Sequence, residues 1–534
     1  MSGSAGGGEE LVFEDVDLVY VYAFDLGVSI SYDTLRWFMK CCGLIEGFWL
    51  PAKAPPENHG PTPVGVYIAA RELGLIGSEV ALKGFMNNEE LLSKLANDDR
   101  IKELINRRHA LFNAIIANDE KALDPDYLDF GHYARFKLVE LEAEVHYPKF
   151  KKDLKQKIAK FRIEPYLLIL IHLRSPLLWS PSVAVITAWI NLKGKFTVDE
   201  LVNLEHLDTE VLDIKDALGN RYETVTLGEF FDAYIKALMG RGAKLGEIRK
   251  ESAETIRVLP AQHIIVSIRG FRCSGEDECL TAEDVVKNHV KEVAGILLRR
   301  MNWRVRRTDG AEKDLGRNLS PSASYAMYLT RGASIFLGSL KLNKEIDDEL
   351  RLGLALDRDT AFRVRELVLV TPVEFLVLWN KMIESSISFY RERLQDIEAE
   401  MRKGKAADLR VYMLLKNVLK ETLDYYSRVT FFKTNPYKGI MEYGKERYES
   451  LRQMNELASE AVNLGKYTKT YREEAEFKTQ ITLTVVYSIL SVLISVFGLL
   501  EKFGLSKALI VTVAVATALG LFSRWYIRRG YEAG

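Results

Sequence analysis

Cysteine is scarce in this chain, with four residues among 534. They are Cys41, Cys42, Cys273 and Cys279, and none stands in the CxxC spacing that tetrahedral zinc sites usually use. So small a number excludes a fold held together by disulfides. One local disulfide, between Cys273 and Cys279, stays open beside the alternative that all four are buried or free thiols.

An excess of charge of either sign is also missing, since 73 basic residues face 74 acidic ones. Nucleic-acid binding requires a clear excess of positive charge to neutralise phosphates, so we expect no nucleic-acid partner. Residues 1–10 lack the basic start and apolar core of a signal peptide, so we expect a flexible tail and a cytoplasmic main body.

Motifs of enzyme active sites are missing as well. The eight histidines are scattered, and none stands in a recognisable nucleophile motif. The glycine-rich segment 240–246 follows a predicted helix instead of a strand, which is the wrong context for a phosphate-binding loop. We therefore expect no enzyme and no firmly implied cofactor.

Strand and helix patterns interleave over residues 11–370. Short apolar runs predict strands at 18–32, 165–173, 182–192, 263–271 and 363–370, and a 3.6-residue periodicity predicts helices at 89–117, 212–240 and 280–300. Such interleaving favours an α+β or α/β cytoplasmic domain, with a break near 133–165 if it consists of two subdomains.

Long helices are predicted from Thr371 onwards. Thr371, Pro372 and Glu374 form a capping box with proline at the first helical position, which predicts that a helix begins here. We predict a helical hairpin over 371–436 and a stalk helix over 437–480. Apolar residues recur in the stalk every three or four positions from Met454, as in a coiled coil.

The longest uncharged run covers Ile481 to Leu500. A helix of this length crosses a hydrocarbon core of about 30 Å, so we predict a transmembrane helix over 481–500. A short external loop at 501–507, a second transmembrane helix at 508–527 and a basic tail at 528–534 complete a two-span transmembrane hairpin. Basic residues outside both spans predict cytoplasmic termini, a cell-membrane (inner or cytoplasmic membrane) location and lipid partners.

Polar side chains follow one face of the first predicted span. Steps of three and four residues separate its members, and the face extends back to Glu473. Such a stripe can line a water-filled pore or pack against another helix, and both interpretations stay open. The candidate residues are Glu473, Gln480, Thr484, Ser488, Ser491 and Ser495.

Five arginines stand close together before the predicted strand at 363–370. They form a candidate patch for anionic lipid or phosphate, with a solvated strand edge as the alternative. The five are Arg299, Arg300, Arg304, Arg306 and Arg307.

The order of these segments resembles the CorA-type superfamily of magnesium and divalent cation transporters. The resemblance covers about 372–529 and is best in PVEFLVLWNKMIESSISFYRERLQDIEAEM and REEAEFKTQITLTVVYSIL. It implies a homopentamer in which the polar stripe surrounds a pore for Mg²⁺ or another divalent cation, with a cation as transported or regulatory ion. Gly498 and Glu501 stand at the external loop, where the family's Gly-Met-Asn signature is absent.

Two functions therefore stay open. The first is an oligomeric membrane channel or transporter for divalent cations, with a divergent selectivity loop. The second is a membrane-anchored cytoplasmic scaffold or sensor that oligomerises through its helical stalk and transports nothing.

Overall fold

The computed structural model describes residues 11–26, 43–50, 59–124 except 78, 131–145, 154–172 except 155 and 156, 182–238, 261–272, 280–402 except 354 and 356, 409–503, 513 and 517. Contacts divide the chain into two compact units. The first is Met1–Ser388 with Glu421–Met454, and the second is Phe389–Lys420 with Asn455–Gly534. The predictions for the tail at 1–10, the four cysteines, the glycine-rich segment 240–246 and the basic tail at 528–534 lie outside the described residues.

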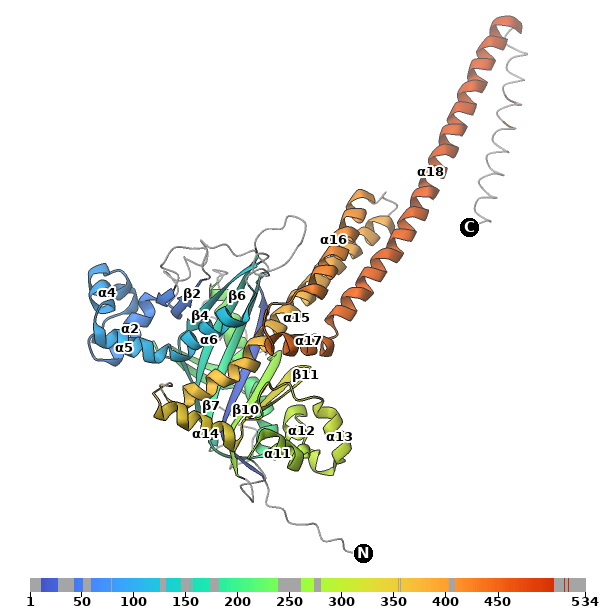
Figure 1. The fold of residues 1–534 in the computed structure, drawn as a ribbon. Helices are drawn as coiled ribbons and strands as arrows, with labels where there is room; N and C mark the ends of the chain where they lie inside the picture. The colour runs from blue at the N-terminus through green and yellow to red at the C-terminus, as the bar shows by residue number, and fades with distance from the viewer. Residues whose placement is uncertain are drawn as a thin grey trace, which may run out of the picture. The chain divides into compact units, whose positions relative to one another are not determined.

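A sheet of twelve described strands forms the centre of the first unit (Figure 1). Its order is β11-β12-β10-β1-β7-β6-β4-β2-β3, while β5 pairs with β6 and β8, and β9 with β8. Neighbours are antiparallel except β10 and β12, which run parallel. The strands are β1 (Val12–Asp25), β2 (Ile45–Trp49), β3 (His59–Pro61), β4 (Gly131–Leu138), β5 (Leu141–Val145), β6 (Lys160–His172), β7 (Val183–Thr197), β8 (Leu212–Asp216), β9 (Arg221–Val225), β10 (His263–Arg272), β11 (Ala326–Thr330) and β12 (Ala333–Leu337).

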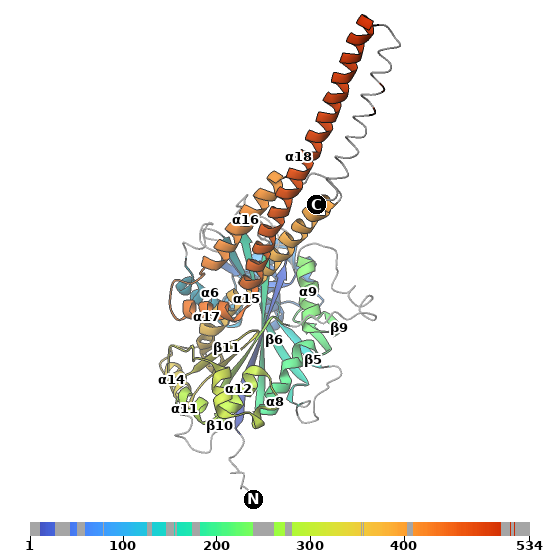
Figure 2. The same cartoon turned by 90° about the vertical axis from the view of Figure 1, so that its right-hand side faces the viewer.

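Helices cover both faces of the central strands (Figures 1 and 2). Alternate residues of β1 point to opposite faces. Asp17 forms an ion pair with Arg363 of α15, whereas the ring of Tyr22 packs 5.3 Å from that of Phe231 on α9. Burial on both faces explains why β1 and β7 are nearly continuous apolar runs, while β5, with one face in solvent, alternates buried and exposed residues.

The helices follow the patterns of apolar spacing and capping in the sequence. α8, for example, begins with a complete capping box between Thr197 and Glu200. The helices are α2 (Pro63–Glu72), α3 (Leu82–Met86), α4 (Glu89–Ala96), α5 (Asp99–Arg108), α6 (Ala110–Ala122), α8 (Val198–Asn203), α9 (Leu227–Leu238), α11 (Ala282–Asn288), α12 (Val290–Leu298), α13 (Thr308–Leu315), α14 (Leu340–Arg351), α15 (Arg358–Arg402), α16 (Leu409–Arg428), α17 (Tyr437–Arg447), α18 (Ser450–Phe503), and the 3₁₀ helices η2 (Leu204–Thr209) and η4 (Trp303–Val305).

α15 differs from the sequence prediction at its start. It begins at Arg358, so the predicted strand at 363–370 is helical, and Pro372 lies inside the helix instead of at its first turn. The Glu374 side chain does not cap a helix, because it pairs with Arg135 at 2.8 Å and accepts a hydrogen bond from Thr187. Tertiary ion pairs beneath the helix therefore override the local capping signal.

α18 contains the stretch predicted as the first transmembrane helix. Among the residues that the structure describes, no helix combines the length and the apolar character needed to cross a membrane. The second predicted span is described only at Val513 and Thr517. The prediction of a two-span transmembrane hairpin is corrected accordingly: the described residues form a mixed α/β domain and long helices. The predicted membrane location, which depended on the hairpin, is corrected with it.

Candidate functional site

α18 carries the polar stripe predicted from the sequence. Gln480, Thr484, Ser491 and Ser495 are exposed on this helix, and Ser488 is half-buried. At 3.6 residues per turn they occupy one face, which Glu473, also exposed, extends towards the start of the helix. All six candidate residues therefore lie on one continuous helix.

Two hydroxyl groups of the stripe donate hydrogen bonds to backbone carbonyl oxygens of the same helix. The Thr484 Oγ1 hydroxyl donates to the Gln480 carbonyl oxygen at 2.8 Å, and the Ser495 hydroxyl donates to the Ser491 carbonyl oxygen at the same distance. A hydroxyl has one proton and two lone pairs, so these two groups offer acceptor oxygens to the surroundings. Such oxygens suit donors on another helix as well as hydrated cations.

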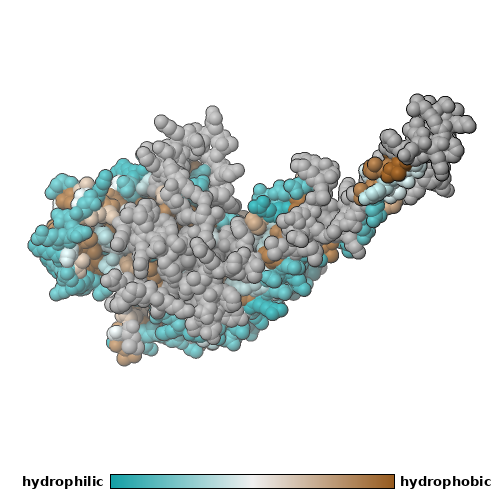
Figure 3. All heavy atoms as spheres, turned by 90° about the horizontal axis from the view of Figure 1, so that it is seen from above, coloured by the Kyte–Doolittle hydropathy of each residue, from teal (hydrophilic) through white to brown (hydrophobic). Residues whose placement is uncertain are grey.

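An apolar seam runs beside the stripe, and the sequence analysis did not single it out. Leu483, Val486, Leu490 and Ile494 are spaced by three and four residues and are 50%, 46%, 47% and 71% exposed. In Figure 3 the outer part of α18 shows brown apolar spheres next to nearly white ones. The spacing of three and four residues could have revealed the seam in the sequence. It is hard to recognise there because nearly all neighbouring residues are apolar as well.

The first turns of α18 are packed differently. Met454, Leu457 and Ala461, the first predicted stalk residues, are fully buried. In the second unit, Tyr390 and Leu394 of α15 and Leu419 of α16 are buried as well. Figures 1 and 2 both show α16 beside the outer part of α15. α18 thus has a packed beginning and an exposed apolar continuation.

Gly498 and Glu501 do not lie in a loop. Both belong to α18, which continues to Phe503, so the predicted external loop at 501–507 begins inside a helix. Among the described residues, no group of three or more histidine, cysteine, aspartate or glutamate side chains is placed to hold a metal ion.

The five clustered arginines do not form a strand edge. Trp303–Val305 is a 3₁₀ helix, and Arg304 pairs with Asp199 at 2.7 Å. Arg306 pairs with Asp314, and Arg299 donates to the Gly332 carbonyl oxygen at 2.9 Å. Arg300 and Arg307 are exposed. The surface around them is therefore mixed in charge.

A buried charge network lies between α15 and the sheet. Arg363 donates to Asp17 at 3.2 Å and to Glu164 at 2.9 Å, while Arg269 also pairs with Asp17. Burial raises the pKa of the Asp17 carboxyl, but Arg269 and Arg363 more than offset this and hold it below its usual value. The sequence signal was Arg363 and Glu366, charged residues three apart in an apolar run.

Glu366 is a member of the network whose negative charge is destabilised by its surroundings. Its carboxylate is fully buried and accepts a hydrogen bond from the Ser267 hydroxyl. Burial, followed by the negative charge of Asp17, raises the pKa of Glu366 to about 7. This carboxyl group therefore changes its protonation close to neutral pH.

Comparison with known proteins gives little to add to this geometry. No family model matches the chain, and no curated protein is similar to it in sequence. Among solved structures, it is similar to the CorA magnesium transporter from Methanocaldococcus jannaschii, with 9% identity over 52% of this chain and 93% of that chain and a TM-score of 0.18. At a TM-score of 0.18 the two structures do not superpose, so this similarity indicates no function for the chain.

Proposed function

We propose that the chain is a self-assembling scaffold or sensor whose copies associate through α18. The observation that carries this proposal is the apolar seam on a helix with buried first turns; its four residues, Leu483, Val486, Leu490 and Ile494, are between 46% and 71% exposed. Exposed apolar surfaces of this kind mark interaction sites. Spacing of three and four residues is the pattern by which parallel helices pack against each other.

The energies favour a bundle of several helices over a pair. Burying a half-exposed leucine, isoleucine or valine side chain stabilises by roughly 0.8–1.5 kcal/mol. Four such side chains on each of two helices give roughly 6–12 kcal/mol, against an association cost of about 4–15 kcal/mol. A single pair is therefore marginal, whereas a closed bundle gives each helix two neighbours.

The experiment is the native mass of the full chain. We expect an oligomer for the unchanged protein and a monomer for Leu483→Gln with Leu490→Gln. The control, Arg452→Gln with Glu460→Gln, changes two exposed residues near the start of the same helix and should keep the oligomer. A monomeric unchanged protein would refute the proposal.

A second candidate function is a channel or transporter for a hydrated divalent cation such as Mg²⁺. The specific support is the stripe, whose hydroxyl oxygens would surround the axis of a bundle and hold a cation through its water shell. We place it second because it requires a membrane-crossing arrangement that the described residues do not contain.

Flux into liposomes loaded with a magnesium-sensitive dye tests this second function. The unchanged protein should give influx, and Ser488→Leu with Ser491→Leu should abolish it. A dye signal no faster than that of empty liposomes rules out the second function and leaves the assembly proposal standing.

A further inference from the structure

A basic cavity of about 580 Å³ opens in the first unit, lined by the ends of β6 and β7, by α5 and α6, and by the first turns of α15. Its volume lies within the range of small-molecule sites. Three of its lining residues are acidic: Glu164, Asp357 and Asp359. Six are basic: Arg107, Lys157, Lys160, Arg162, Lys193 and Arg363.

The three carboxylates are engaged by donors of the protein itself. Glu164 accepts a hydrogen bond from Arg363 at 2.9 Å, and Asp359 accepts one from Arg269 at 2.7 Å. Asp357 accepts from the backbone N–H of Thr360 at 2.7 Å and so caps the start of α15. Glu164 and Asp359 are therefore each paired with an arginine, while Asp357 is engaged by Thr360 at the start of α15.

Lys157 pairs with Glu200 at 2.7 Å and Lys160 with Glu144 at 3.0 Å, whereas three other cations are held only weakly or not at all. Lys193 is exposed and has no ion-pair partner among the described residues. Arg107 lies 3.4 Å from Glu103 and Arg162 lies 3.9 Å from Glu142, with every one of these side chains more than 60% exposed. Long, exposed ion pairs contribute little to stability, so these side chains can turn towards a ligand.

Arg363 supplies a fixed cation in the wall. Its side chain is 9% exposed, is held by Asp17 and Glu164, and lies with its guanidinium carbon 5.5 Å from the centre of the Trp189 ring. A guanidinium group that is fixed in this way presents planar donors suited to phosphate oxygens. The cavity thus combines one preorganised cation with several adaptable ones.

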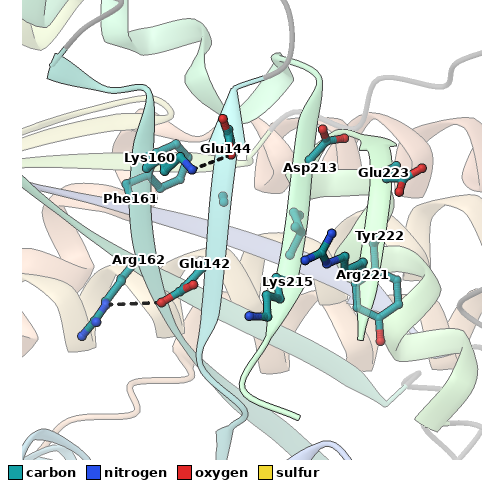
Figure 4. Close-up of a pocket in the computed structure, with 12 residues that line it drawn as sticks. Glu142, Glu144, Lys160, Phe161, Arg162, Asp213, Lys215, Arg221, Tyr222 and Glu223 are labelled. Carbon is teal, nitrogen blue, oxygen red and sulfur yellow. Dashed lines mark ion pairs between the residues drawn. The ribbon is translucent and has the colours of Figure 1, made fainter. Parts of the chain in front are cut away.

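A neighbouring cavity provides a comparison of nearly equal size. It measures about 570 Å³ and lies over β5, β6, β8 and β9, with four basic and four acidic lining residues. Figure 4 shows the ion pairs of Lys160 with Glu144 and of Arg162 with Glu142 across it, and the carboxylates of Asp213 and Glu223 on the same face. The neighbouring cavity, which shares Lys160 and Arg162 with the basic cavity, thus has a balanced lining, whereas the basic cavity has more basic than acidic lining residues.

We propose that the basic cavity binds a small ligand that carries a chain of phosphate groups. Its lining carries six basic side chains against three acidic ones, and a set of several cations suits a chain of phosphate groups better than a single phosphate or a carboxylate. The ligand would touch the first turns of α15, a helix shared by both units. The binding proposal is argued from the cavity alone. It rests on the proposed function in one respect: if the chain is a sensor, this ligand class is what it senses.

Calorimetric titration of the full chain with inorganic triphosphate tests the proposal. We expect one site per chain. Arg107→Gln with Lys193→Gln should weaken binding at least about tenfold, since each substitution removes a charge-assisted contact. The control, Lys215→Gln with Arg221→Gln, removes two cations from the neighbouring cavity and should leave the affinity unchanged.

The possible outcomes distinguish a nucleotide ligand from a phosphate chain alone, and they distinguish failure of the binding proposal from failure of the assembly proposal. Tighter binding of a nucleoside triphosphate than of inorganic triphosphate would support the site and assign it to nucleotides, whereas equal affinities would support it for the phosphate chain alone. No binding by the unchanged protein, or equal loss in both variants, would overturn the proposal. The native mass of the same samples reports on assembly independently, so either proposal can fail without the other.

Discussion

Buried ionisable side chains are the residue-scale feature of this molecule with the clearest consequences. Arg135 lies fully buried between two carboxylates, with Asp119 at 2.6 Å and Glu374 at 2.8 Å. Burial raises the pKa of Asp119 to about 6, and the negative charge of Glu374 adds to the rise, while Arg135 opposes it. His263 is also buried, between Tyr448 and Ser334, and burial lowers its pKa to about 3, which keeps it neutral.

Glu366→Gln should change how stability depends on pH. The pKa of Glu366 is raised from 4.5 to about 7 in the folded state, so the folded protein holds this proton more tightly than the unfolded chain does. Stability is therefore lost as pH rises from about 4.5 to about 7, by about 3 kcal/mol. The glutamine variant, neutral throughout, should exceed the unchanged protein in stability by a small margin at pH 5 and by a much larger one at pH 8.

Denaturant unfolding at pH 5, 6, 7 and 8 measures this difference. The comparison of variant with unchanged protein is needed because His263 acts in the opposite direction: its lowered pKa removes stability as pH falls from 6.5 towards 3. Parallel pH curves for the two proteins would contradict the role given to Glu366.

Arg135→Met should be strongly destabilising, by about 3–5 kcal/mol, because it leaves Asp119 and Glu374 buried without their partner. Arg100→Met is the control, since Arg100 is exposed and pairs with Asp98 at the surface, and no measurable change is expected. The midpoint of chemical unfolding measures both. Similar midpoints for the two variants would mean that the buried arginine has little role in stability.

At the scale of elements, close backbone approach fixes how α2 sits on β2. A Cβ atom at Gly65 would lie 2.4 Å from the Glu46 carbonyl oxygen, whereas one at Gly84 in α3 would meet nothing within 4 Å. Gly65→Ala should therefore destabilise by about 1–3 kcal/mol, because the helix has to move off the strand. Gly84→Ala should stabilise by about 0.5–1 kcal/mol, since alanine favours a helix. Unfolding curves of the same sign for both would refute this explanation.

Strands of the sheet were easier to predict than its order. The apolar runs at 165–173, 182–192 and 263–271 correspond closely to parts of β6, β7 and β10. β1 pairs with both β7 and β10, which lie far from it in the sequence. Such long-range pairing produces no local pattern in the sequence from which the strand order could be predicted. The start of α15 was missed because its buried face carries Arg363 and Glu366, whose partners on β1, β6 and β10 become visible only once the sheet is assembled.

The candidate site was predictable only in part. The spacing of the stripe on α18 followed directly from the sequence, because helical periodicity is local. The predicted loop at Gly498 and Glu501 failed, since a short polar segment after an apolar run does not by itself end a helix. The basic cavity could not have been predicted, because its lining comes from five segments that meet only in the fold.

At the scale of the whole molecule, assembly through α18 should be visible by cross-linking. Leu490→Cys places a thiol on the apolar seam, and mild oxidation should give covalent dimers within a native oligomer. Arg452→Cys, on an exposed position near the start of α18, should give few. Denaturing gels without reductant measure the yields, with the unchanged protein showing the background of the four native cysteines. Equal yields at both positions would argue against seam contacts.

α15 passes from one unit into the other as a single helix of 45 residues, with Pro372 inside it. Proline has no N–H to donate to the carbonyl of Val368, so the helix lacks one hydrogen bond there. The helix is held before this point by the ion pair of Arg363 with Asp17, and after it by the ion pair of Glu374 with Arg135, both within the first unit. The missing hydrogen bond therefore lies inside the part of α15 that the sheet holds on both sides, and contacts of side chains such as Arg363 and Glu374, instead of the local backbone bond, keep the helix continuous there.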